Sequence, residues 1–380
     1  MRKLNKYFLG LFVLIISVVW SCNSVTSSSS NEIIPFDSDR WEISGVETSI
    51  EDYLGKTSLN IKGGTAIVED SDMTDGIIEY KVAFPDERGF VGVIWHYRDE
   101  QNFEKFYIRP HQSGNPDASQ YTPVINGMTA WQLYPEYGAR ISFPYDEWIP
   151  VKVVISGESA EIYVNDMSEP VVFIDDLKSD FNSGKVGVET ENFAAAYFTD
   201  FSFTPMDNPP LKGSVEEEED PEGAIKSWSI SNAFDENLLA EKTQLTEEDK
   251  QGLTWQEVVT ENSGLINLAQ VQKAEEGKNT VFVRTTIVAD QEQIKALDVG
   301  FSDRIKVYLN DQAIFSARDK VLSRDYRFLG TVGYYDKLYL PLKEGNNELW
   351  IEVTEGFPVT GWGIQTKFED LEGISLASAS

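Results

Sequence analysis

Short runs of alternating apolar and polar residues, separated by turn-forming residues, limit the fold of this chain more than any other feature. Between residues 36 and 205 the clearest runs cover 77–84, 91–98, 151–156 and 160–164, with Gly, Pro, Asp or Asn between them. Successive side chains of a strand point to opposite faces, so such alternation is typical of strands with one buried face. Helix-type periodicity does not interrupt these runs, and the sequence therefore predicts an antiparallel β-sandwich.

The second half of the chain repeats the pattern. Strongly β-type runs follow one another from residue 280 to residue 353. One short helix is expected near 246–256, because Thr246 followed by three acidic residues suits a capped first turn. The predicted fold class is all-β, with two antiparallel β-sandwich (jelly-roll) domains.

A break in composition divides the chain. Residues 207–222 contain prolines, glycines and a block of acids, which cannot build a core, and the chain is too long for one ordinary core. The predicted segments are a signal peptide (1–21), a flexible Ser-rich tether (22–32), a first sandwich (33–206), an acidic linker (207–222), a second jelly roll (223–373) and a tail (374–380).

The N-terminus has the layout of a cleaved signal peptide. Residues 1–6 contain three basic residues and no acidic one, residues 7–20 are almost wholly apolar, and Ser21-Cys22 follows. The apolar run is shorter than the roughly 20 residues that a helix needs to span a bilayer. Val19 to Cys22 resembles a bacterial lipobox, although Trp20 is atypical, and this resemblance implies lipidation of Cys22. Plain secretion or an uncleaved anchor is the alternative.

A lipidated Cys22 implies a lipid-anchored protein of the bacterial cell envelope, with the membrane as one partner. Acidic residues directly after Cys22 are missing, which favours the periplasmic face over the outer surface. The chain carries 63 acidic and 32 basic side chains, and removal of residues 1–21 with their three basic residues changes the formal charge from −31 to −34. This charge repels phosphate backbones, so nucleic acid is not an expected partner.

Metal and cofactor sites have little support in the composition. One Cys excludes an internal disulfide and a Cys-rich zinc site, and two His leave little for a His-based metal centre. Acidic residues at 69–72 and Asp200 offer oxygen ligands of the kind that calcium prefers. No cofactor is expected, a structural calcium ion is left open, and no metal ligands are assigned.

Several segments of the first module resemble a known family. Phe36 to Trp41 and the segments 92–103, 148–153, 161–165, 184–188 and 198–201 follow one another in an order similar to that of concanavalin A-like domains. The similarity is to the laminin G-like branch and to the 3-keto-disaccharide hydrolase family within it. It implies a two-sheet jelly roll whose concave face or edge loops often hold sugars. No catalytic set of that family can be carried over to this chain residue by residue.

The second module resembles a galactose-binding-like jelly roll through the segments 264–268, 300–311, 340–347 and 361–363. Modules of that kind accompany many extracellular carbohydrate-binding proteins and glycosidases. The favoured interpretation is a spacer or docking unit in which Asp303 and the turn residues are framework. The alternative is a second sugar contact through Arg304, Arg324, Asp325, Tyr334, Tyr335 or Trp362.

The segment 107–132 has the composition of a sugar-binding loop. Sugars stack on aromatic faces and need both donors and acceptors for their hydroxyls. The predicted ligand-binding residues are Arg109, His111, Gln120, Tyr121, Asn126, Trp131 and Gln132. The alternative is a long loop packed down by Tyr121 and Trp131, with its amides capping turns.

Strand alternation makes two further predictions about this region. In 91–98 it places Val91, Val93, Trp95 and Tyr97 on one face and Gly92, Ile94, His96 and Arg98 on the other. On the return strand it places Tyr107, Arg109 and His111 together on one face.

Catalysis is a weaker expectation than binding. Glu189 and Glu191 lie two apart, so they share a strand face about 7 Å apart, a spacing that carboxylate chemistry tolerates. His96 and His111 are weak candidates for acid–base chemistry.

The expected function is binding of glycans or glycoconjugates through the first sandwich. The first alternative is a carbohydrate-active enzyme, a glycoside hydrolase or lyase that includes 3-keto-disaccharides among its candidate substrates. The second is a non-enzymatic envelope assembly or adhesion protein.

Overall fold

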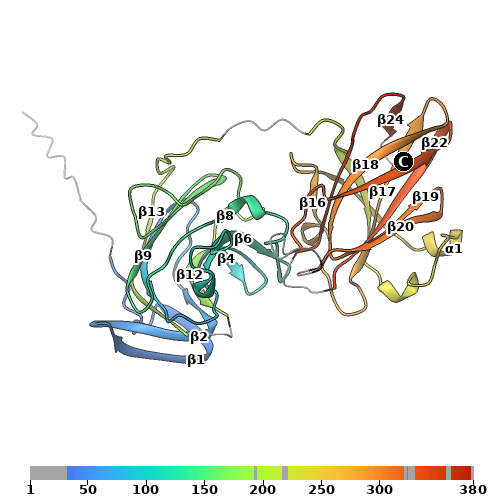
Figure 1. Cartoon of the computed structure of the whole chain (residues 1–380). Helices are drawn as coiled ribbons and strands as arrows, with labels where there is room; N and C mark the ends of the chain where they lie inside the picture. Colours follow the sequence, from blue (N-terminus) through green and yellow to red (C-terminus); the bar gives the residue numbers. More distant parts are fainter. Residues whose placement is uncertain are drawn as a thin grey trace, which may run out of the picture.

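The structure is a computed structural model of the 380-residue chain, and it describes residues 32–191, 195–215, 221–320, 323, 330–356 and 361–377. Cys22 and the predicted signal peptide lie outside the described residues. No helix in the described ranges is both long and apolar enough to cross a membrane. The strands form two lobes, and almost all regular structure is antiparallel β, which confirms the predicted fold class (Figure 1).

The N-terminal lobe contains the first thirteen strands. They are β1 (Trp41–Tyr53), β2 (Lys56–Val68), β3 (Gly76–Ala83), β4 (Val91–Asp99), β5 (Asn102–Ile108), β6 (Ser119–Ile125), β7 (Met128–Thr129), β8 (Gly138–Ala139), β9 (Ile149–Ser156), β10 (Ser159–Val164), β11 (Val172–Ile174), β12 (Lys185–Thr190) and β13 (Ala196–Pro205). Two 3-10 turns, Pro110–Gln112 and Pro135–Tyr137, interrupt them.

One curled sheet surrounds the core of this lobe. Its strand order is β11-β10-β9-β3-β13-β2-β12-β4-β5-β6-β7. Strand β2 joins the two layers, because its residues 59–61 pair with β13 and its residues 64–67 pair with β12. Alternate residues from both layers meet in a single apolar cluster around Trp95, Tyr121 and Phe198.

A β-bulge near the end of β4 changes the predicted faces. Val91, Val93 and Trp95 lie in the core as predicted. The register with β5 shifts after Trp95, and His96 has a φ of 48°. The extra residue of a bulge reverses the alternation that follows it. The prediction that Tyr97 faces the core with Trp95 is therefore wrong, since Tyr97 packs beside Ile94.

The C-terminal lobe is a two-sheet sandwich. Its strands are β14 (Ser227–Ser231), β15 (Trp255–Val259), β16 (Leu265–Asn267), β17 (Thr280–Ala289), β18 (Gln293–Ser302), β19 (Arg304–Leu309), β20 (Gln312–Arg318), β21 (Asp336–Leu342), β22 (Gly345–Thr354), β23 (Gly363–Phe368) and β24 (Ile374–Ala377). One sheet has the order β15-β14-β17-β22-β19-β20, with β24 on β17, and the other has the order β16-β23-β18-β21.

Two segments of this lobe differ from the sequence-based expectation. The helix expected near 246–256 is only the single turn α1 (Glu247–Lys250), in which the Asp249 carboxylate accepts a hydrogen bond from the Thr246 backbone N–H. Strand β15 begins at Trp255, because residues 255–259 pair with β14 instead of continuing the helix. Residues 374–377, expected within a tail, form β24 and pair with β17.

The two lobes are joined by the lobe clamp, which we define as residues 119–134 of the β6–β7 hairpin and the turn after it. Ile125 and Met128 of the clamp belong to the apolar core of the C-terminal lobe. In return, Leu265 and Val332 pack into the core of the N-terminal lobe. Each lobe therefore completes part of the other lobe's core.

Candidate functional site

Most predicted ligand-binding residues belong to the lobe clamp and bind the protein itself. The Gln120 side-chain amide donates to the carbonyls of Trp131 (2.8 Å) and Tyr134 (2.9 Å), and its oxygen accepts from the Tyr107 hydroxyl (3.1 Å). Tyr121 is fully buried, and its hydroxyl donates to a Glu104 carboxylate oxygen at 2.8 Å. Neither side chain has a polar group turned to solvent.

The other clamp residues connect the lobes. Asn126 has a φ of 53° in the hairpin turn, and its amide donates to the Ala269 carbonyl at 2.8 Å. The buried Gln132 donates to the Gly330 carbonyl at 2.8 Å and accepts from the Ser302 hydroxyl at 2.9 Å. Trp131 is half-buried. These clamp residues thus use their polar groups within the protein, although Gln120 remains in contact with Tyr107 of the neighbouring strand.

Arg109, His111, Glu189 and Glu191 gather on the face of the N-terminal sheet that is turned away from the main apolar core. We call this group, together with Phe90, Lys105 and Tyr107 beside it, the β5–β12 site. Strands β4, β5 and β12 bring it together, because Gly92 pairs with Glu189 on one side and with Tyr107 on the other. Paired residues of antiparallel strands share a face.

A glycine makes room for the central ion pair. A Cβ on Gly92 would lie 2.8 Å from the Phe106 carbonyl oxygen and 3.2 Å from Cγ of Glu189. Without that Cβ, the Glu189 side chain lies over β4 and reaches Lys105, with Nζ and Oε1 2.8 Å apart. The two side chains are only 6% and 11% exposed, so both charges are largely withdrawn from water.

Phe90 gathers the aromatic and basic members. Its ring centroid lies 5.7 Å from that of Tyr107 and 5.8 Å from that of His111, and the guanidinium carbon of Arg109 lies 5.2 Å from it. Tyr107, Arg109 and His111 therefore meet around one ring. Only Tyr107 lies in β5, whereas His111 lies in the 3-10 turn Pro110–Gln112, so the expected continuation of the strand is not what brings them together. Sequence reasoning missed Phe90, although alternation from Gly92 places position 90 on the same face.

Arg109 is held in place and keeps one donor free. Its Nη1 forms an ion pair with Asp117 at 2.6 Å. Its Nε–H is buried and has no hydrogen-bond partner among the described residues. A buried donor without a partner is costly, and a bound acceptor group such as a hydroxyl would satisfy it.

The titratable groups of the site have different environments. Burial raises the pKa of Glu191, and the nearby Glu189 carboxylate adds to the effect, whereas Lys105 opposes it. Burial lowers the pKa of His111, and the charge of Arg109 lowers it further, so this imidazole favours the neutral form. The site therefore offers donors, acceptors and an aromatic surface together.

His96 lies apart from this site. Its Nε2 lies 2.8 Å from the Thr74 carbonyl, the side chain is buried, and burial lowers its pKa. His111 instead accepts a hydrogen bond from the Gly89 backbone N–H, so the two histidines have separate partners and do not form one acid–base pair.

The residues expected to bind sugar in the C-terminal lobe are dispersed. Trp362 is in the core, with its indole N–H donating to the Val353 carbonyl at 3.2 Å. Arg304 is paired with Glu236 at 2.6 Å, and the Tyr334 hydroxyl donates to the Ser263 carbonyl. Tyr335 is partly exposed. Arg324 and Asp325 lie outside the described residues.

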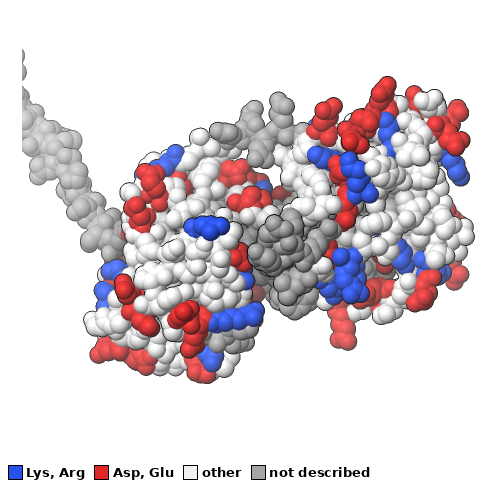
Figure 2. All heavy atoms as spheres, viewed as in Figure 1, with Lys and Arg blue, Asp and Glu red and all other residues white. Residues whose placement is uncertain are grey.

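Asp200 and Glu69, two of the acids considered for calcium, face basic side chains. Asp200 lies 2.7 Å from Lys56 and 3.0 Å from Lys81, and Glu69 lies 2.9 Å from Lys185. Within the described ranges no group of three or more His, Cys, Asp or Glu side chains is placed to hold a metal ion. Acidic side chains are spread over both lobes, with no single acidic patch on the visible face (Figure 2).

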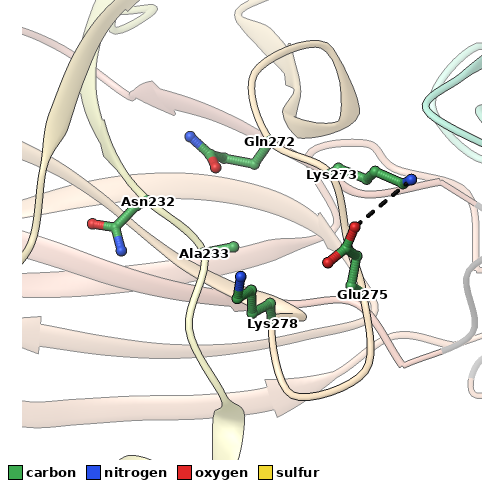
Figure 3. Close-up of a pocket in the computed structure, with 6 residues that line it drawn as sticks. All are labelled: Asn232, Ala233, Gln272, Lys273, Glu275 and Lys278. Carbon is green, nitrogen blue, oxygen red and sulfur yellow. Dashed lines mark ion pairs between the residues drawn. The ribbon is translucent and has the colours of Figure 1, made fainter.

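A surface depression of about 330 Å³ opens beside the end of β14 (Figure 3). Its lining is polar and contains no aromatic ring: Asn232, Ala233, Gln272, Lys273, Glu275 and Lys278. Lys273 and Glu275 neutralise each other at 3.7 Å, and the Asn232 side-chain oxygen accepts from the Thr254 backbone N–H. This depression offers less to a sugar ring than the β5–β12 site.

Comparison with known proteins identifies similar folds. No family model and no curated protein matches the sequence. Among solved structures, the carbohydrate-binding module CBM66 from Bacillus subtilis is 16% identical, with 43% of this chain and 94% of that chain covered and a TM-score of 0.34. A Bacillus licheniformis β-glucanase is 9% identical, with 47% and 99% covered and a TM-score of 0.33.

A Bacillus subtilis protein of unknown function with a galectin-like fold is 12% identical, with 44% of this chain and 92% of that chain covered and a TM-score of 0.33. At these identities the similarity concerns the fold alone.

We expect Lys105→Met to lower the free energy of unfolding by about 3–5 kcal/mol, because it leaves the Glu189 carboxylate buried without its counter-charge. The double variant Lys105→Met/Glu189→Gln should recover part of this loss. Urea denaturation measures both. The control is Lys62→Met, which removes an exposed pair with Glu47 at 3.5 Å and should cost about 0–1 kcal/mol. Equal losses for the two single variants would contradict the assignment of a desolvated pair.

Proposed function

We propose that this chain is a glycan-binding lipoprotein of the Gram-negative cell envelope that binds saccharides through the β5–β12 site. The single observation that carries the binding proposal is the arrangement around Phe90. The Phe90 ring contacts an arginine, a histidine and a tyrosine there. The buried ion pair of Lys105 and Glu189 belongs to the same face. Sugar rings bind through aromatic contact together with directional hydrogen bonds, and this site supplies both.

The ionic members suit the recognition of hydroxyl groups. Carboxylates of Glu189 and Glu191 accept hydrogen bonds, and Arg109 donates them. Because Asp117 holds Arg109 from one side, little side-chain freedom is lost when a ligand accepts from the remaining guanidinium N–H groups.

We expect Arg109→Ala and Phe90→Ala to weaken glycan binding at least tenfold, since each removes one of the two kinds of contact. The measurement is a glycan array followed by calorimetric titration of the best saccharide. Arg40→Ala is the control, because Arg40 forms an exposed pair with Asp70 in the same lobe.

An unchanged array profile in both Phe90 and Arg109 variants would overturn the site. If the wild-type protein bound no glycan but retained a protein partner in envelope pull-downs, the assembly or adhesion alternative would replace the binding proposal.

A second candidate function is cleavage of glycosidic bonds, by hydrolysis or by elimination. The two carboxylates of the site favour this candidate. Glu191, with its raised pKa, suits a general acid, and Glu189 beside Lys105 suits a nucleophile or base. A general acid acts while protonated, so activity should fall as pH rises through the raised pKa of Glu191.

For this candidate, Glu191→Gln should abolish product release from polysaccharides or 3-keto-glucosides while saccharide binding persists. Chromatography of the products measures the release, and Glu47→Gln on the exposed ribbon of β1 is the control. Product release that is equal in wild type and Glu191→Gln, or absent from the wild type, would remove this candidate.

The envelope location rests on the N-terminal sequence. We expect the wild-type chain, expressed in a Gram-negative host, to incorporate a labelled fatty acid and to sediment with membranes. Cys22→Ser should abolish the labelling, because the thiol is the lipid attachment point, whereas Ser27→Ala should not. An unlabelled wild-type protein in the soluble fraction would contradict the anchor.

A further inference from the structure

The outward face of the larger C-terminal sheet is half covered. Along β17, Val281, Val283 and Ile287 point into the core, so Phe282, Arg284 and Thr286 point outward. The segment between β14 and β15, which includes α1, covers Phe282 through Leu239 and Leu245 (Figure 1). The same cluster includes Trp350 and one side of Trp255. Beyond it lies the part of the face that we call the open half, where Arg284 and Thr286 are partly exposed and Glu257 and Glu348 are exposed.

A row of side chains crosses four strands at the edge of the open half, and its members range from Ser229 and Trp350, which are buried, to Glu257, which is exposed. Ser229 on β14 pairs with Glu257 on β15 and with Arg284 on β17, and Arg284 pairs with Trp350 on β22. In the next row, Thr286 pairs with Glu348. Paired residues share a face, so these side chains form one continuous surface.

Two tryptophans position the arginine of this surface. The guanidinium carbon of Arg284 lies 3.9 Å from the ring centroid of Trp255 and 5.3 Å from that of Trp350. The two rings are nearly perpendicular, with centroids 5.1 Å apart. Cation–π contacts of this kind fix the guanidinium plane without using its N–H groups.

Arg284 has no ion pair or hydrogen bond to any other described residue, and its Nε–H is buried. The nearest acids on this face are already engaged, since Glu257 accepts from the Ser229 hydroxyl and Glu348 accepts from the Trp350 indole at 3.2 Å. The two Nη groups of Arg284, which are not among the buried unpartnered atoms, are thus available to a ligand, whereas the Nε–H is not reached from solvent.

We propose that this open half, centred on Trp255 and Arg284, binds an uncharged saccharide and gives the chain a second glycan site. Trp255 is half-buried and offers ring surface for stacking, while Arg284, Thr286 and Glu257 offer donors and acceptors for hydroxyls. The site lies on a different lobe from the β5–β12 site and does not depend on it.

The charges of this face select the ligand class. Arg284 is flanked by the exposed Glu257 and Glu348, so an anionic sugar would meet two carboxylates and a cationic one would meet the guanidinium. Lys250, 5.2 Å from the Trp350 ring, is neutralised by Asp311 at 2.6 Å. A neutral chain of hydroxyl-bearing rings avoids both repulsions.

The test titrates the full mature chain with uncharged hexasaccharides (cello-, xylo-, laminari- and mannohexaose) and with the anionic hexagalacturonate. We expect at least one uncharged saccharide to bind. Trp255→Ala and Arg284→Met should each weaken this binding at least tenfold. Tyr339→Ala, which removes a 67% exposed aromatic from the other sheet of the same lobe, is the matched control and should bind as wild type.

Thr286→Arg serves as a second variant, since it obstructs the open half while Trp255 and Arg284 remain, and it should abolish the same binding. All titrations are repeated in the Arg109→Ala background, which isolates the C-terminal site from the β5–β12 site. Loss caused by Trp255→Ala but not by Arg109→Ala would support this site and refute the β5–β12 site, and the converse result would refute this one.

Three results would overturn the inference. They are no binding of any uncharged saccharide in the Arg109→Ala background, unchanged binding after both Trp255→Ala and Thr286→Arg, and stronger Trp255-dependent binding of hexagalacturonate than of the uncharged saccharides.

Discussion

Burial of the lobe clamp in the C-terminal lobe is the interaction on which the rest of the molecule depends. Ile125 and Met128 leave their own lobe and complete the apolar core of the other one. The polar groups around them are then desolvated and need partners, which Gln132 finds in Ser302 and Gly330, and Tyr134 in Glu261. A segment with the composition of a sugar-binding loop consequently becomes an internal surface.

The β5–β12 site shows how a sheet can carry charge on its outward face. Lys105 and Glu189 lose hydration when they are buried, and their mutual attraction offsets this cost only while both are present. Gly92 permits the close approach, because any larger residue would displace Glu189. Such a pair adds little net stability compared with apolar residues, and its presence fits a surface shaped for a polar ligand.

Both proposed glycan surfaces lie on sheet faces that the cores do not use. Strand alternation assigns every second residue to the main core of each lobe, and the other residues can include polar and charged side chains even where they are buried. In the N-terminal lobe these positions collect Lys105, Tyr107 and Glu189, and in the C-terminal lobe they collect Arg284, Thr286 and Trp350. Two such surfaces on one chain would increase the avidity for a polysaccharide that reaches both.

The sequence by itself determined the all-β class and the core positions of Val91, Val93 and Trp95, because strand alternation is a local property. Only the tertiary structure decided that Tyr97 lies on the opposite face of the sheet from Trp95, because a β-bulge depends on the partner strand. It also decided the burial of Gln120 and Gln132, and the meeting of Trp255 with Arg284. These outcomes depend on strand register and on docking between segments that are far apart in the chain. A local sequence pattern does not encode which distant segments come into contact.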